Sequence, residues 1–91
     1  MNPTPKLADV ILDLCRNAPN SGTIDPIDAA KAYVEASGGG PGTPYQRYLD
    51  SVRETAVKLA RDGQIVIYRK GVPADPDTFK GVYRLGLANN A

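Results

Sequence analysis

The sequence predicts an α+β domain of the winged helix-turn-helix type, and three observations support this prediction. Three amphipathic segments precede two β-type segments, a proline-rich loop separates the two β-type segments, and a short bridging strand, Thr23-Ile24, lies between the first two helical segments. Helix, short strand, helix, helix, strand, long loop, strand is the element order of a winged helix, whose second and third helices form the helix-turn-helix. The C-terminal β-hairpin is then the wing, and its loop is expected to project.

Length and composition predict one domain that covers residues 1–91, because a chain of 91 residues can bury only one modest core. Hydrophobic residues make up 42% and charged residues 23%, as in ordinary globular proteins. No apolar run approaches the roughly 20 residues that cross a bilayer, and MNPTPKLADV does not have the pattern of a signal peptide. We therefore expect a cytoplasmic protein that is not associated with a membrane.

The residue inventory argues against an enzyme, a metal site and a cofactor. The chain has no histidine and one cysteine, Cys15, so zinc ligands and the commonest general base are missing. Gly38 to Gly42 lacks the Lys-Ser/Thr pair that completes a P-loop. Asp75 and Asp77 are too few for a hard cation, which gathers about six oxygens, and turn formation around Pro76 explains them better. Cys15 is expected to be a small buried hydrophobe.

The first two helices are predicted from a repeated signal, a capping residue followed by proline at the first helical position. Thr4-Pro5 opens the first helix, and Asp25-Pro26 opens the second, which extends to about Ala36. Thr23-Ile24 between them is long enough only for a bridging strand. The residues expected to face the core are Leu7, Val10, Ile11, Leu14 and Ala18 in the first helix and Ile27, Ala30 and Val34 in the second.

The third helix is predicted to extend from Thr43 to about Asp62. Thr43 and Gln46 have the spacing of a capping box, and Gly63 can end the helix in the left-handed conformation. The glycine-rich residues 37–43 before it are expected to form a flexible loop, and residues 1–4 and 88–91 are expected to fray. The residues predicted for the core side of this helix are Leu49, Val52, Ala56 and Leu59.

Two strands are predicted over Gln64 to Lys70 and Val82 to Leu87, where β-branched and aromatic residues gather. The loop between them, Gly71 to Gly81, is about twice as long as a usual hairpin loop. Its stem carries the cations that concern function, which are Arg69, Lys70 and Lys80.

Several short motifs between Asp25 and Leu87 occur together in a fixed order. They are Asp25-Pro26, Val52-Arg53, Ala56, Leu59-Ala60, Gly63-Gln64-Ile65, Arg69-Lys70-Gly71, Asp75-Pro76 and Lys80-Gly81-Val82-Tyr83-Arg84-Leu85. In these the chain resembles a family of small bacterial proteins known only as a domain of unknown function and expected to be winged helices. The chain departs from that pattern at Tyr45-Gln46, where the family has a Trp-Arg pair, and in its longer Gly-Pro loop. The resemblance implies the fold and supplies no catalytic residue.

Charge is distributed unevenly, and this favours a polyanionic partner. Residues 1–44 hold three basic and five acidic side chains, whereas residues 45–91 hold eight basic and five acidic ones. A basic C-terminal half is typical of a surface that meets nucleic acid. Cations at the stem of the wing, Arg69, Lys70 and Lys80, could reach phosphates and release counterions. Positive charge on an edge strand equally protects against edge-to-edge aggregation.

The third helix is the candidate for reading bases in the major groove of double-stranded DNA. Gln46 and Arg47 near its start have donors that suit adenine and guanine. Asp50 and Glu54 on the same face would repel phosphates, which leaves a protein-interaction module without nucleic-acid binding as the alternative. The residues predicted to bind DNA are Gln46, Arg47, Ser51, Lys58, Arg69, Lys70 and Lys80.

Overall fold

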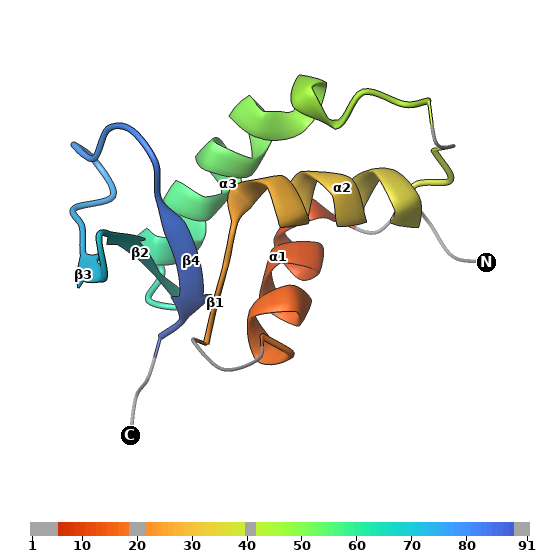
Figure 1. Cartoon of the computed structure of the whole chain (residues 1–91). Coiled ribbons are helices and arrows are strands. Elements are labelled where there is room, and N and C mark those ends of the chain that lie inside the picture. Colours follow the sequence, from red (N-terminus) through yellow and green to blue (C-terminus); the bar gives the residue numbers. More distant parts are fainter. Residues whose placement is uncertain (1–5, 19–21, 40–41, 89–91) are drawn as a thin grey trace.

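The computed structural model of the protein describes residues 6–18, 22–39 and 42–88 (Figure 1). In chain order, the elements are α1 (Leu7–Arg16), β1 (Thr23–Ile24), α2 (Pro26–Ala36), the 3₁₀-helix η1 (Tyr45–Tyr48), α3 (Leu49–Arg61), β2 (Ile65–Arg69), β3 (Val72–Pro73) and β4 (Arg84–Leu87). Over these residues the fold is α+β, with three α-helices and a four-stranded antiparallel sheet that includes the C-terminal strands. The predicted fold class is confirmed, and the arrangement is compatible with a winged helix.

The sheet pairs a strand near the start of the sequence, β1, with the last strand, β4. Its strand order is β1-β4-β2-β3, so the short β1 pairs with the last strand, and Ile24 lies opposite Leu85. Leu85 in turn lies opposite Ile67 of β2. These three side chains are buried on the sheet face that the helices cover (Figure 1). Because neighbouring residues of a strand point to opposite faces, Tyr68 and Arg84, which are register partners, lie on the other face.

The core draws between one and three side chains from each α-helix and from the strands β1, β2 and β4. The largest side chains that are fully buried are Ile11, Val52, Ile65, Ile67 and Leu85. Cys15 of α1 is 4% exposed, which confirms the prediction of a buried hydrophobe. Burial disfavours the thiolate and raises the pKa of the Cys15 thiol to about 11.

Helix α2 has the predicted bounds and the predicted cap. The Asp25 carboxylate accepts the Ile27 N–H at 2.9 Å, and Asp28 accepts the Asp25 N–H at 3.2 Å, which completes a capping box. The prediction that Ile27 faces the core is wrong, because its side chain is 37% exposed. Ala30 and Val34 are buried as predicted, and Ala29, which was not predicted, is fully buried as well. The cap sets the rotation of the helix so that the buried face centres on Ala30 and leaves Ile27 at its edge.

The ends of the predicted first helix and of the C-terminal tail are only partly covered by the described residues. Thr4 and Pro5, the predicted helix start, lie outside them, and α1 begins at Leu7 after Lys6, whose side chain forms no cap. Residues 1–4 and 89–91 also lie outside them. Ala88, expected to fray, is held by a hydrogen bond from its N–H to the Gln64 carbonyl at 3.1 Å.

The predicted capping box at the start of the third helix is wrong. Residues Tyr45–Tyr48 form a 3₁₀-helix without a side-chain cap, and α3 begins only at Leu49. In a 3₁₀-helix, residues three apart lie on the same side. Tyr45 and Tyr48 can therefore both turn toward α2, where Tyr48 meets Tyr33 edge to face at 5.3 Å between ring centroids. The end of α3 agrees with the prediction, since it stops at Arg61 and Gly63 follows with φ +78°.

The prediction of a single projecting wing loop is also wrong. Arg69 pairs with Val72 across a two-residue turn in which Lys70 has φ +53° and Gly71 has φ +80°, as in a tight β-hairpin. The chain from Ala74 to Tyr83, here called the return segment, then folds back beside α3. Phe79 in this segment is only 6% exposed and belongs to the core. Burial of an aromatic side chain outweighs solvation of the loop, and this draws the return segment onto the helix.

Candidate functional site

The exposed face of η1 and α3 carries four of the predicted DNA-binding residues. Gln46 and Arg47 lie in η1, Ser51 and Lys58 lie in α3, and all four are exposed. Asp50 and Glu54 are exposed in α3 as well. The face therefore mixes both signs of charge, with the basic groups toward its two ends.

Two other arginines of α3 hold the return segment and are not free for a partner. The Nη2 of Arg53 donates to the Phe79 carbonyl at 2.7 Å, and its guanidinium lies 4.1 Å from the Phe79 ring centroid. Arg61 donates to the Asp77 carboxylate in an exposed ion pair. The Phe79 ring also meets Tyr83 edge to face at 5.0 Å between centroids. These contacts connect the helix to the return segment along most of its length.

A turn at the start of the return segment explains its carboxylates. The Asp75 side chain accepts the Asp77 N–H at 2.9 Å, and the Asp75 carbonyl accepts the Phe79 N–H at 3.0 Å. The turn role predicted from the sequence is confirmed for the Asp75 side chain, whereas the Asp77 carboxylate pairs with Arg61. Lys80 directly after Phe79 is exposed, so the turn that buries Phe79 leaves a cation at the surface.

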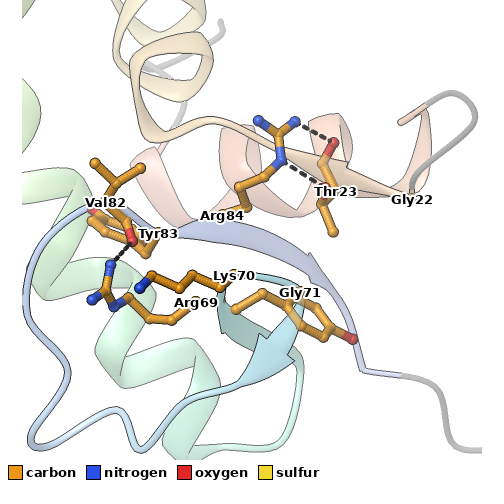
Figure 2. A pocket seen from close by; sticks show the side chains of 9 residues that line it. Gly22, Thr23, Arg69, Lys70, Gly71, Val82, Tyr83 and Arg84 are labelled. Carbon is orange, nitrogen blue, oxygen red and sulfur yellow. Dashed lines mark hydrogen bonds between the residues drawn. The ribbon is translucent and has the colours of Figure 1, made fainter.

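A pocket of about 760 Å³ lies on the sheet and is called the sheet pocket (Figure 2). The β2–β3 hairpin supplies Tyr68, Arg69 and Lys70 to its wall, and the start of β4 and the residues before it supply Val82 and Arg84. Gly22 and Thr23 close it on the side of β1. Two predicted residues, Arg69 and Lys70, therefore come together here with a third cation.

Arg69 connects the hairpin to the return segment across the sheet pocket. Its Nη1 donates to the Val82 carbonyl at 2.7 Å, as drawn in Figure 2. A Cβ at Gly81, which has φ +85°, would lie 3.1 Å from the same Nη1. Glycine at position 81 therefore allows the chain to turn where the guanidinium passes. Arg69 has a structural partner, yet its remaining N–H groups face no described carboxylate.

Arg84 was not among the predicted site residues. Its Nε donates to the Thr23 hydroxyl at 2.8 Å, its Nη2 donates to the Thr23 carbonyl at 3.2 Å, and its Nη1 lies 4.0 Å from the Asp25 carboxylate. Strand alternation could have found it, because Leu85 beside it is an obvious core residue and neighbouring strand residues face opposite ways. The pairing of β1 with β4, which brings Thr23 to it, could not be read from local sequence.

The position of the Tyr68 ring, which lines the sheet pocket, depends on a glycine in β4. Gly86 is buried, and a Cβ there would lie 2.9 Å from the Gly22 carbonyl oxygen and 3.2 Å from Cε2 of Tyr68. The absence of a side chain lets the Tyr68 ring lie close over the strand. Tyr83 is buried nearby, and burial raises the pKa of its phenol although the Arg53 charge opposes the rise.

The predicted DNA-binding residues thus fall into separate groups. Figure 1 shows η1 and the β2–β3 hairpin well apart, with α3 extending between them. Gln46, Arg47 and Ser51 lie toward the start of α3, whereas Arg69 and Lys70 lie in the hairpin. The last two in the predicted set, Lys58 and Lys80, lie in neither group.

A comparison with models of known protein families identifies the family of the chain. The model of a family described as a protein of unknown function (DUF3253) matches residues 4–88. The chain belongs to the DUF3253 family. The resemblance to a domain of unknown function is thereby confirmed, and membership of DUF3253 assigns no activity. No match was found among curated proteins.

Two further structural findings complete the description of the site. No group of three or more metal-ligating side chains comes together within residues 6–18, 22–39 and 42–88. No helix in this same part of the chain has both the length and the apolar character to cross a membrane.

Proposed function

We propose that this DUF3253 protein is a double-stranded DNA-binding winged-helix protein, with α3 toward the major groove and the β2–β3 hairpin beside the phosphate backbone. The observation that carries the proposal is the antiparallel sheet order, in which β1 pairs with β4 and β4 pairs with β2 beside a helix pair. In this arrangement α3 packs against β2, the first strand of the β2–β3 hairpin, and a winged helix would use such a helix and hairpin together on one duplex. Gln46 and Arg47 would read base edges, and Ser51 would contact the backbone.

The exposure of four basic side chains, and their lack of ion pairs among the described residues, support the proposal. Arg47, Lys58, Lys70 and Lys80 are exposed and take part in no ion pair among the described residues. Cations without intramolecular partners can neutralise phosphates without first breaking an ion pair. Because the family resemblance is to bacterial proteins, whose chromosome lies in the cytoplasm, the proposal places the protein in that compartment.

The longest dimension of the domain sets the length of the DNA duplex that a binding test should use. Its longest axis is 35 Å, which corresponds to about one turn of B-DNA. A random-sequence duplex of about 16 base pairs therefore covers the whole footprint. With about four phosphates neutralised, affinity should fall roughly a hundredfold between about 50 mM and about 200 mM salt.

The experiment is fluorescence anisotropy of this duplex with the full chain at the two salt concentrations. Lys80→Gln and Lys58→Gln should each weaken binding and lower the magnitude of the salt slope by about one. Arg16→Gln is the matched control, because this substitution also removes one positive charge from an exposed position. Arg16 lies beside a separate depression between α1 and α2. Absence of binding at low salt, or equal weakening by Arg16→Gln, would defeat the proposal.

A protein-interaction module is the second candidate, and one observation favours it. Asp50 and Glu54 are exposed on the face of α3 that would approach the groove, while Val82 beside the sheet is 79% exposed. Glu54→Gln separates the candidates. If α3 faces DNA, removal of this carboxylate strengthens duplex binding, whereas in a protein-interaction module neither form binds the duplex.

A further inference from the structure

We propose that the sheet pocket binds a small organic anion with a flat apolar body. The pocket is formed by the β2–β3 hairpin, the residues that lead into β4 and the start of β1. Its lining includes three cationic residues, Arg69, Lys70 and Arg84, here called the rim, together with Tyr68 and Val82. This inference goes beyond DNA binding and does not require it.

The charges of the rim favour an anion. Arg69 and Lys70 form no ion pair among the described residues, and the one carboxylate beside Arg84 is that of Asp25 at 4.0 Å. Arg69 and Lys70 are neighbours in a tight turn, and Arg84 lies in the strand that pairs with the same hairpin. Three cations with one distant carboxylate leave an excess of positive charge, which a bound anion would neutralise.

The geometry of the rim supplies donors as well as charge. The Nη1 of Arg69 is engaged by the Val82 carbonyl, and this contact fixes the guanidinium while leaving its other N–H groups for a ligand. Arg84 is fixed in the same way by Thr23. Donors already held in place lose little side-chain entropy on binding. The exposed Lys70 supplies a mobile third donor.

The wall and the size of the pocket favour a flat organic body over a bare inorganic ion. The volume of about 760 Å³ lies in the usual range of small-molecule sites, and carbon atoms form most of the lining. Gly86 lets the Tyr68 ring lie close to the sheet, so the ring is held in position as a surface on which a planar ligand can pack. An aromatic carboxylate or an aryl phosphate has this combination of charge and shape.

The test is a titration of the isotope-labelled full chain, followed by amide chemical shifts. The probes are benzoate and phenyl phosphate, with benzyl alcohol as the neutral analogue and inorganic phosphate as the anion without an apolar body. Saturable shifts at Lys70, Gly71 and Gly86 are expected with both organic anions. Benzyl alcohol and inorganic phosphate should bind at least about threefold more weakly, since each lacks one of the two features.

Variants at the rim locate the binding. Lys70→Gln keeps most of the aliphatic stem and should weaken benzoate binding about threefold to fivefold, as for a partly exposed charge contact, while Lys70→Arg should retain it. Arg16→Gln, which removes a charge outside the pocket, should have no effect. In the unmodified chain, added salt should also weaken benzoate binding.

Three results would overturn the proposal. The first is that benzoate does not bind, and the second is that benzyl alcohol binds as tightly as benzoate. The third is that the shifts do not cluster at the sheet pocket or do not respond to Lys70→Gln. The duplex used above provides a separate measurement. If the chain binds benzoate but not the duplex, the pocket proposal stands and the DNA-binding proposal fails. If the chain binds the duplex but not benzoate, the DNA-binding proposal stands and the pocket proposal fails.

Discussion

The substitution Phe79→Ala tests whether the return segment is part of the folded core. Phe79 is 6% exposed, its ring meets Tyr83 at 5.0 Å and the Arg53 guanidinium at 4.1 Å, and its carbonyl accepts a hydrogen bond from Arg53. Truncation of a buried phenylalanine costs about 3–5 kcal/mol. Because small domains have only about 5–15 kcal/mol of stability, this loss is a large fraction of the total. The melting temperature should fall by at least about 12 °C.

Urea denaturation followed by far-UV circular dichroism measures this loss. Phe79→Leu keeps most of the buried volume and loses the ring contacts, so it should cost about 1–2 kcal/mol. Val72→Ala is the control in the same hairpin region, because Val72 is 62% exposed and its truncation should change stability by about 0.5 kcal/mol or less. If Phe79→Ala costs no more than Val72→Ala, the return segment does not pack on α3 in solution and the reasoning is refuted.

Three further predictions concern the packing, the cap and the thiol. Gly86→Ala should cost about 1–3 kcal/mol in urea denaturation because the new Cβ would lie 2.9 Å from the Gly22 carbonyl, whereas Gly42→Ala, with open space around it, should be nearly neutral. Asp25→Ala removes the cap of α2 and should cost about 1 kcal/mol in the same assay, and an unchanged midpoint would contradict the capping role. The pKa of Cys15 rises from 9.0 to about 11 on folding. The stability that the protonated thiol contributes is therefore fully present below pH 9, and it is lost as the pH rises toward 11, because the unfolded chain loses this proton first. A pH series of denaturation curves should show this decline. Cys15→Ala should lessen it and leave the part that comes from Tyr83, whose phenol pKa burial also raises.

The local sequence alone predicted those elements whose boundaries depend on the backbone chemistry of one or two residues. Asp25-Pro26 starts α2 because a carboxylate satisfies free N–H groups and proline needs none. Gly63 ends α3 because only glycine enters the left-handed conformation without strain. The β-branched and aromatic residues of Gln64 to Lys70 predicted a strand, and β2 lies within these bounds. None of these depends on which element lies beside them.

The tertiary structure decided every feature that requires two distant segments to meet. The start of α3 moved from Thr43 to Leu49 because the tyrosines of η1 pack toward α2. The wing folded onto α3 because Phe79 gains more from burial than a projecting loop gains from water. Arg84 joined Arg69 and Lys70 because β4 inserts between β1 and β2. Such contacts depend on the balance of burial energy against chain entropy over the whole domain, which local spacing does not contain.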